Sequence, residues 1–182
     1  MTILPPDLYI LHDSLFTTGI TRLGVVVRYR IRVASLIVRD SKILLVQHVH
    51  PTTKAVWWVP PGGGLDATDP SLFACAARET FEETGLKVSL SRIVYIREFV
   101  DNEYKVFNLE LFLLADEFAG SPSLRNVAGC GPDEHYIKDL RWMSQSEMTE
   151  IAVYPNILKN QFWIDLASGF PRPLYLGRDY GP

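Results

Sequence analysis

The chain has 182 residues, a length that fits one domain of ordinary size. Hydrophobic residues make up 47% of the composition and charged residues 21%, which excludes general disorder. The formal net charge of −3 argues against a strongly basic nucleic-acid-binding protein, and no apolar run approaches the ~20 residues of a membrane-spanning helix. The first residues lack the basic region of a signal peptide, and two cysteines do not form a disulfide scaffold. We therefore expect a cytoplasmic protein with no membrane association and no stable nucleic-acid partner.

The amino-terminal third of the chain predicts an appendage followed by strands. Residues 1–28 include an early pair of prolines, which disfavours a helix, and we treat them as an N-terminal appendage to a domain at residues 29–182. Apolar residues at 31–38 and 43–46 flank a polar break, which predicts a β-hairpin with buried strands. A short strand at 56–59 then ends at two prolines and enters three glycines, whose backbone can approach a ligand closely.

The clearest helix is predicted at residues 71–84. Ser71 or Asp69 can cap its start, and Gly85 stands where a glycine commonly ends a helix. The remaining predicted elements are strands at 87–90, 93–100, 105–114 and 139–143, helices at 145–151 and 155–168, a turn at 101–103, a surface loop at 119–132 and an irregular tail after residue 170. Strands on both sides of one helix, with further helices at the end, predict an α/β fold in which helices cover a mixed sheet.

Three carboxylates are expected to lie together on the predicted helix. A helical wheel places Glu79, Glu82 and Glu83 on an arc of about 100°. The opposite, core-facing arc is expected to hold Phe73, Ala77, Thr80 and Thr84. Like charges at this spacing repel by a few tenths of a kcal/mol per pair, and Mg²⁺ or Mn²⁺ would remove that repulsion by binding carboxylate oxygens. Arg78 can neutralise and orient Glu82 through its planar guanidinium group.

A glutamate-rich helix face is, by itself, more often a solvated surface than a metal site. The order of the surrounding residues changes that balance, because a glycine-rich turn, a capped helix, an Arg–Glu pair, a Glu–Glu pair and a terminal glycine follow one another. This segment, residues 62–86, resembles the Nudix box of the MutT-like pyrophosphohydrolases, G-x5-E-x7-R-E-U-x-E-E-x-G-U, where U is a bulky aliphatic residue. The matching residues are Gly64, Arg78, Glu79, Glu82, Glu83, Gly85 and Leu86.

The segment departs from the box at two positions. Pro70 stands where the first glutamate of the box is expected, and Thr80 stands where a bulky aliphatic residue is usual. If Gly63 opens the box instead, Asp69 occupies the glutamate position at the cost of one inserted residue. In the family that glutamate is mainly a structural and charge partner, often of the arginine, so Asp69 or Asp66 is expected to take its role.

The resemblance implies an α/β/α sandwich with a mixed sheet between helices. It also implies a metal-dependent pyrophosphohydrolase in which water attacks a phosphorus atom of a nucleoside diphosphate linked to another group, X. Glu79, Glu82 and Glu83 would bind Mg²⁺ or Mn²⁺ together with the carbonyl of Gly63, and Arg78 would orient the carboxylates. The remaining implications are a general base at Glu79 or at Glu134 in a later loop, a small nucleotide-diphosphate substrate and a homodimer.

Two other functions stay open on the sequence. The altered first glutamate position is compatible with a catalytically silent nucleotide-binding or regulatory module of the same fold. An isomerase-type relative acting on an isoprenoid diphosphate would need a catalytic cysteine in a strand-end loop, whereas Cys75 is predicted inside the helix as a packing residue and Cys130 in a loop. Side chains with weaker functional interpretations are His48 and His50 as phosphate contacts and Arg97 and Lys105 as contacts to an anionic substrate. Trp57 and Trp58 alternate across a strand, so one is expected in the core and the other could stack on a base, although core packing is favoured for both.

Overall fold

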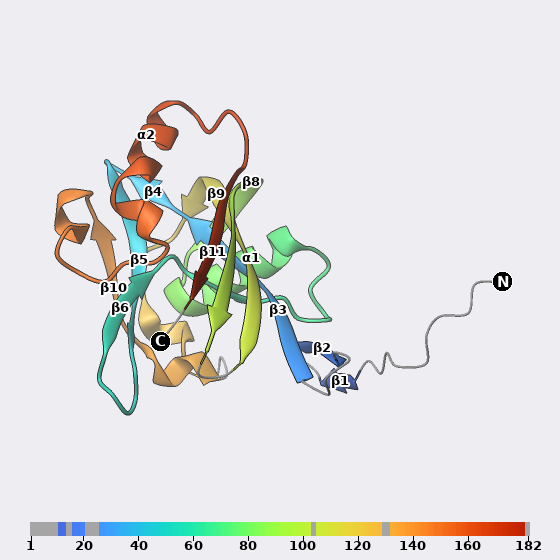
Figure 1. Cartoon of the computed structure of the whole chain (residues 1–182). Coiled ribbons are helices and arrows are strands. Elements are labelled where there is room, and N and C mark those ends of the chain that lie inside the picture. The colour runs from blue at the N-terminus through green and yellow to red at the C-terminus, as the bar shows by residue number, and fades with distance from the viewer. Residues whose placement is uncertain (1–10, 14–15, 21–25, 103–104, 129–131, 181–182) are drawn as a thin grey trace.

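The computed structural model describes residues 11–13, 16–20, 26–102, 105–128 and 132–180 (Figure 1). The strands of a large sheet are β1 (Leu11–Asp13), β2 (Phe16–Ile20), β3 (Val26–Leu36), β7 (Gly62–Gly64), β8 (Lys87–Asp101), β9 (Val106–Ala119) and β11 (Leu174–Tyr180). The strands of a small sheet are β4 (Val38–Arg39), β5 (Lys42–Val49), β6 (Val56–Val59) and β10 (Ile137–Met143). The helices are α1 (Leu72–Thr84) and α2 (Gln161–Ala167), with short 3₁₀ helices η1 (Leu124–Asn126), η2 (Pro132–His135), η3 (Ser146–Met148) and η4 (Asn156–Lys159).

The large sheet is mixed, as the sequence predicts. Its strand order is β1-β2-β3-β9-β8-β11, with β7 paired to β3. The β3–β9 and β8–β11 pairs are parallel, whereas β8 and β9 run antiparallel. The small sheet has the order β10-β5-β4, with β6 on β5.

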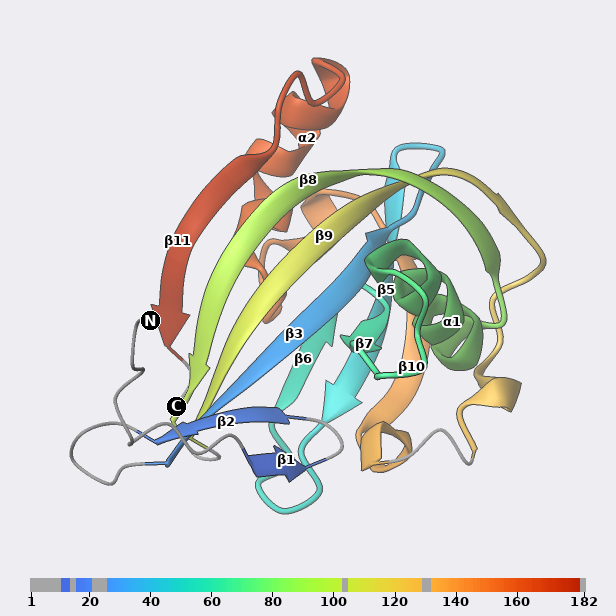
Figure 2. The ribbon, with the colours of Figure 1, turned by 90° about the vertical axis from the view of Figure 1, so that its right-hand side faces the viewer.

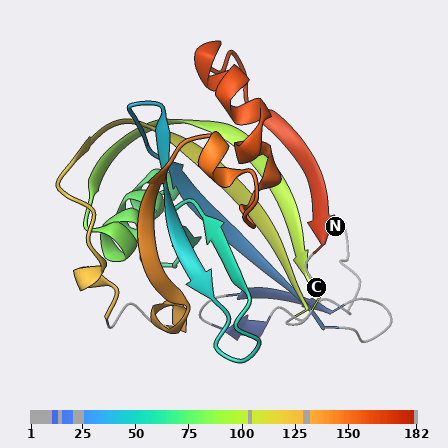
Figure 3. The ribbon, with the colours of Figure 1, turned by 90° about the vertical axis from the view of Figure 1, so that its left-hand side faces the viewer.

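Helices cover both faces of the large sheet, which confirms the sandwich. Alternate residues of β3 and β9 point to opposite faces. On one face, Val33, Leu111 and Leu113 pack against Cys75 and Ala76 of α1. The other face packs against the small sheet and α2 through a larger cluster that includes Ala34, Leu36, Tyr95, Phe112, Trp58 and Phe162. Figure 2 shows α1 in front of the large sheet, and Figure 3, from the opposite side, shows β5, β6 and β10 in front of it.

Local signals locate α1 correctly. Ser71 is the N-cap, and its hydroxyl accepts a hydrogen bond from the Ala74 amide at 3.1 Å. Gly85 adopts the left-handed conformation with φ of 72°, and its N–H donates to the Phe81 carbonyl. The predicted helix at 71–84 is therefore confirmed to within a residue.

Several strand predictions need correction because their pairing is non-local. The predicted strand at 31–38 divides between two sheets: β3 pairs with β9, and the hairpin is the β4–β5 turn, where Asp40 and Ser41 have φ of 51° and 57°. The three glycines form β7 instead of an open turn. The tail after residue 170, predicted as irregular, forms β11 because it pairs with β8.

The predictions at the two ends of the domain are also modified. Within residues 1–28, β1 and β2 pair with each other and β2 pairs with β3, so the predicted appendage adds strands to the large sheet. The helix predicted at 145–151 is only η3, and the one predicted at 155–168 is divided into η4 and α2. Among the described residues, no helix is long and apolar enough to cross a membrane.

Replacing Gly85 by alanine should destabilise the protein by about 1 kcal/mol, because alanine is strained at a φ of +72°. A Cβ atom there would meet its nearest neighbour, the Ser123 carbonyl oxygen, at 3.6 Å, so the loss arises from backbone conformation and not from a clash. Urea unfolding measures it. Gly85→Asn is the matched control, since asparagine tolerates this conformation and should recover most of the loss; equal stability of Gly85→Ala and the wild type would contradict the assignment.

Candidate active site

The glycine strand β7 lies directly against the acidic side of α1. The Gly62 amide donates to Glu83 Oε2 at 2.9 Å. A Cβ atom at Gly62 would lie 2.1 Å from the Val33 carbonyl oxygen, and one at Gly63 would lie 2.3 Å from the Glu79 carboxylate. Only glycine therefore allows β7 to pair with β3 and to receive two helix carboxylates at the same time.

Arg78 is the centre of the charged cluster. Its Nε and Nη2 atoms donate to the two carboxylate oxygens of Asp69 at 2.9 and 2.8 Å. Its Nη1 atom donates to Glu79 Oε1 at 2.8 Å and to Glu82 Oε2 at 3.0 Å. One guanidinium group thus connects three carboxylates from the loop and from the helix.

Asp69 supplies the carboxylate that Pro70 cannot. Its side chain is buried, and hydrogen bonds from Arg78, aided by the Asp66 amide, hold its pKa well below the usual range. Asp66 instead accepts from the backbone and hydroxyl of Thr68. Of the two residues that the sequence left open, the structure therefore selects Asp69 as the partner of Arg78.

The helix surface differs from the predicted wheel at Glu83. This residue is only 3% exposed and is one of the buried residues of α1, with Ala76, Thr80 and Thr84, so its assignment to an arc facing away from the core is wrong. Phe73, placed at the centre of the core face, is only partly buried. The physical reason is β7, which packs beside α1 and turns the buried arc toward the glycines, where the Gly62 amide hydrogen bond replaces the hydration of Glu83.

The cluster has the chemistry of a site for a hard divalent cation. The carboxylates of Asp69, Glu79 and Glu82 surround the single guanidinium group of Arg78, and the Glu83 carboxylate accepts from the Gly62 amide, so the cluster has an excess of negative charge. Oxygen donors of this kind suit Mg²⁺ and Mn²⁺. In the part of the chain that the structure describes, no three acidic, histidine or cysteine side chains converge as a preformed metal site, because Arg78 and the Gly62 amide hold the carboxylates.

The other candidate residues have mixed outcomes. Glu134 lies on η2, with Oε1 3.6 Å from His135 Nε2, and its role as a base stays a prediction. Trp58 is a core residue at 4% exposure, whereas Trp57 is partly exposed and its ring stacks on His48 with centroids 5.6 Å apart.

Arg97, a weaker candidate, and Cys75, predicted as a packing residue, both lie inside the protein. Arg97 is buried and forms an ion pair with Glu110, so it does not offer its charge to a substrate at the surface. Cys75 is fully buried, its thiol donates to the Gly64 carbonyl at 3.4 Å, and burial raises its pKa to about 12. Cys75 is therefore a packing residue, and Cys130 lies outside the described residues.

Sequence reasoning missed the contact of Arg32 with the glycine strand. Its Nη2 atom donates to the Gly62 carbonyl at 2.9 Å, and its Nη1 atom lies 3.6 Å from Glu110 Oε1. The available signals were an arginine alternating with apolar residues on a predicted strand and a glutamate inside an apolar run.

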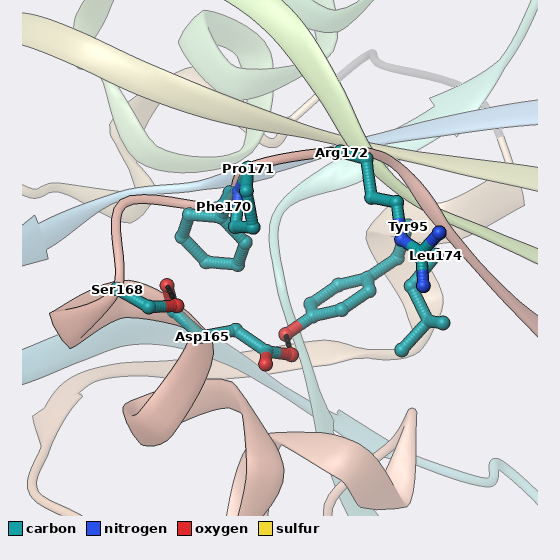
Figure 4. Close-up of a pocket in the computed structure, with 7 residues that line it drawn as sticks. All are labelled: Tyr95, Asp165, Ser168, Phe170, Pro171, Arg172 and Leu174. Atoms are coloured by element: carbon teal, nitrogen blue, oxygen red, sulfur yellow. Dashed lines mark hydrogen bonds between the residues drawn. The ribbon is translucent and has the colours of Figure 1, made fainter.

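A cavity of about 190 Å³ lies on the other side of the large sheet, between α2 and β11 (Figure 4). The Tyr95 hydroxyl donates to Asp165 Oδ2 at 2.6 Å in its wall, and burial together with this bond raises the pKa of Tyr95. Because Tyr95 faces the cluster opposite α1, this cavity is separate from the acidic groups around Arg78.

Comparisons with known proteins agree with this geometry. A family model described as the NUDIX domain matches residues 28–161. A curated relative, putative hydrolase 111R of Invertebrate iridescent virus 3, is 42% identical over 64 residues, so the match spans about a third of each protein, 35% in both cases.

Solved structures share the fold at low sequence identity. The MutT NUDIX hydrolase from Burkholderia pseudomallei has a TM-score of 0.59 at 22% identity, covering 73% of this chain and 97% of its own. An ADP-ribose pyrophosphatase from Streptococcus suis has a TM-score of 0.53 at 20% identity, covering 82% of this chain and 98% of its own.

Asp69→Asn should lower the free energy of unfolding by about 2 kcal/mol at pH 7, because a buried partner of Arg78 loses its charge. The folded-state pKa of Asp69 is depressed, so its contribution is complete above the unfolded pKa of about 3.9 and is lost as the pH falls through the folded value. Denaturant unfolding from pH 7 down to pH 2.5 should therefore show the two proteins converging in acid. Asp66→Asn is the control, with a smaller loss; a constant gap between wild type and Asp69→Asn at every pH would refute the charge assignment.

Proposed function

The chain belongs to the Nudix hydrolase family, and from this premise we propose that it is a metal-dependent pyrophosphohydrolase that cleaves a nucleoside diphosphate linked to a second group, X. The observation that carries the proposal is the arrangement of three carboxylates around Arg78, with a fourth, of Glu83, held by the glycine strand. Exposed ion pairs contribute only about 0–1 kcal/mol to stability, so a simple surface ion pair does not explain the burial of these charged groups.

Glu79, Glu82 and Glu83 would hold Mg²⁺ or Mn²⁺, with the Gly63 carbonyl as a backbone ligand. A bound divalent cation neutralises phosphate charge, polarises the phosphoryl oxygens and lowers the pKa of water. Arg78 keeps Glu79 and Glu82 at fixed positions on α1, and Asp69 fixes Arg78 in turn. These contacts arrange the carboxylates before a substrate arrives, which reduces the reorganisation that the reaction requires.

The general base that takes a proton from the attacking water is proposed to be Glu79 or Glu134. Glu79 lies against Gly63 and accepts a hydrogen bond from Arg78. Glu134 lies on η2, on the connection between β9 and β10. Glu134→Gln decides between them, because Glu134 is not a proposed metal ligand: a large loss of kcat with KM nearly unchanged identifies Glu134 as the base, and a retained rate assigns the role to Glu79.

The second candidate is a nucleotide-binding or regulatory module without turnover. The observation that favoured it was Pro70 in place of the first glutamate of the box. Asp69 now provides a carboxylate to Arg78, so this support is weakened. A cytoplasmic location and the lack of a stable nucleic-acid partner also stay proposals, which rest on composition and a net charge of −3.

We expect metal-dependent cleavage when the protein is incubated with a panel of nucleoside-diphosphate-X compounds, including ADP-ribose and nucleoside triphosphates, with and without Mg²⁺ or Mn²⁺. Glu82→Gln should reduce turnover by about 100-fold or more, because a metal ligand is lost. Stability should change by less than about 0.5 kcal/mol, since Glu82 is partly exposed and Arg78 already offsets its charge. Products are resolved by chromatography.

Glu117→Gln is the matched control, since Glu117 is an exposed glutamate of β9, and it should retain the wild-type rate. Near-normal turnover by Glu82→Gln would contradict the metal assignment. Retained nucleotide binding without cleavage of any compound would favour the regulatory module.

The homodimer is also a proposal, and its support is an uncovered apolar area on the large sheet. In Figure 2, β3, β9, β8 and β11 extend beyond α1 with no helix in front of them. The exposed side chains on this outer face are Tyr29 at 55%, Ile31 at 41%, Leu109 at 40%, Tyr175 at 56% and Tyr180 at 66%. With roughly 200 Å² for a large aromatic side chain, these side chains together expose on the order of 500 Å² of apolar surface. This area is near the upper end of the apolar patch sizes found on monomeric proteins.

A second copy of the chain fits this face because the face is electrically balanced. Arg178 forms an ion pair with Glu98 there and lies over the Phe107 ring, so two identical faces can meet without a conflict of charge. Sedimentation or light scattering should give twice the chain mass for the wild type and the chain mass for Ile31→Arg. Tyr154→Asp, which alters an exposed tyrosine elsewhere, should stay dimeric; a monomeric wild type at high micromolar concentration would rule out this interface.

A further inference from the structure

A row of three charged side chains lies beside β7, on the face of the large sheet that packs against the small sheet and α2. Arg32 of β3 and Arg97 of β8 both stand opposite Glu110 of β9 in the strand registers. The side chains of Arg97, Glu110 and Arg32 are 6%, 7% and 17% exposed. The row therefore lies inside the protein, next to the core cluster that contains Ala34 and Phe112.

The three side chains connect β8 to the glycine strand. Arg97 donates from Nε and Nη2 to Glu110 Oε2, the first of these at 2.7 Å. The other carboxylate oxygen, Oε1, lies 3.6 Å from Arg32 Nη1. Arg32 Nη2 then donates to the Gly62 carbonyl at 2.9 Å. Glu110 holds both arginines, and Arg32 is its link to β7.

Gly62 is consequently held from two sides. Its carbonyl accepts from Arg32, and its amide donates to Glu83 of α1. The first contact fixes the orientation of the peptide group that joins Gly62 to Gly63. The second fixes a carboxylate that the proposed function assigns to the metal.

Stability alone does not account for this row. Burying charged groups is expensive, and apolar side chains of similar volume are often at least as stabilising as a buried ion pair. Electrostatic positioning of a backbone segment is a use that apolar residues cannot replace. The Gly62 carbonyl is the one backbone group of β7 to which Arg32 is hydrogen-bonded in the described structure.

We infer that Arg32, held by Glu110 and Arg97, is a positioning residue that fixes the glycine strand against Glu83 for catalysis. This inference rests on the proposed hydrolase function. Arg32 acts through the Gly62 peptide and not through contact with substrate, so its loss should affect kcat and leave KM nearly unchanged.

The test compares Arg32→Met, Arg32→Lys and the wild type in two measurements. Steady-state kinetics on the cleaved panel compound should show kcat for Arg32→Met reduced by about 10- to 100-fold, KM within about threefold, and partial recovery in Arg32→Lys. Arg32→Met leaves Glu110 paired with Arg97, so the buried carboxylate keeps a partner and the protein should fold, as thermal unfolding will verify. Hydrogen exchange of the metal-free protein should be at least about tenfold faster at the Gly62 amide in Arg32→Met, with exchange at the Gly85 amide unchanged.

Arg92→Met is the matched control variant. Arg92 also donates to a glycine carbonyl, that of Gly169 at 3.0 Å, but this glycine follows α2 and is not part of β7, so replacing Arg92 should alter neither kcat nor Gly62 exchange. An unchanged kcat for a folded Arg32→Met, or a rise in KM alone, would overturn the inference, the latter by indicating direct substrate contact. If the wild type cleaves no compound of the panel, the proposed function fails; Gly62 exchange still decides whether Arg32 holds the glycine strand.

Discussion

The structure of the candidate site depends on one cation, the Arg78 guanidinium group, among three carboxylates. Arg78 is placed by α1 so that its guanidinium reaches Asp69 on one edge and Glu79 and Glu82 on the other. Without it, acidic groups one turn apart would repel and turn outward to water. Its planar geometry also dictates where each carboxylate oxygen lies, which a lysine ammonium group could not do. Arg78 neutralises only part of the negative charge. The carboxylate charge that remains would attract the proposed divalent cation.

The glycine strand is the second half of this arrangement. Because β7 has no side chains, the backbone of β3, the Glu79 carboxylate and the Glu83 carboxylate all approach it closely. Burial of Glu83 is tolerated only because a backbone amide takes the place of water. The strand thus lies between a helix and a sheet, and its position determines where the charged groups on both sides lie.

Features encoded by neighbouring residues could be predicted from the sequence. The boundaries of α1 follow from Ser71 and Gly85, and the pairing of Arg78 with Glu82 follows from helical spacing. Features that arise from distant pairing could not. The burial of Glu83 depends on β7 lying beside α1, and the formation of β11 depends on β8, some 80 residues earlier. The choice of Asp69 over Asp66 was limited to two residues by the sequence and was settled by a loop geometry that no local pattern encodes. The Arg32–Glu110 contact joins residues whose roles are invisible until two parallel strands are aligned.

The carboxy-terminal strand β11 has a consequence for how copies of this protein can assemble. A sheet edge with regular free hydrogen-bonding groups invites further strands, and repeated addition leads to open-ended aggregates. β11 covers the edge of β8 and becomes the new edge, but its register shifts between Tyr175 and Arg178, and Gly177 in the gap has a φ of 86°. A strand distorted at its middle is a poor template for a straight partner. Growth along the sheet is thereby discouraged, and the proposed dimer would use a face of the sheet and not this edge.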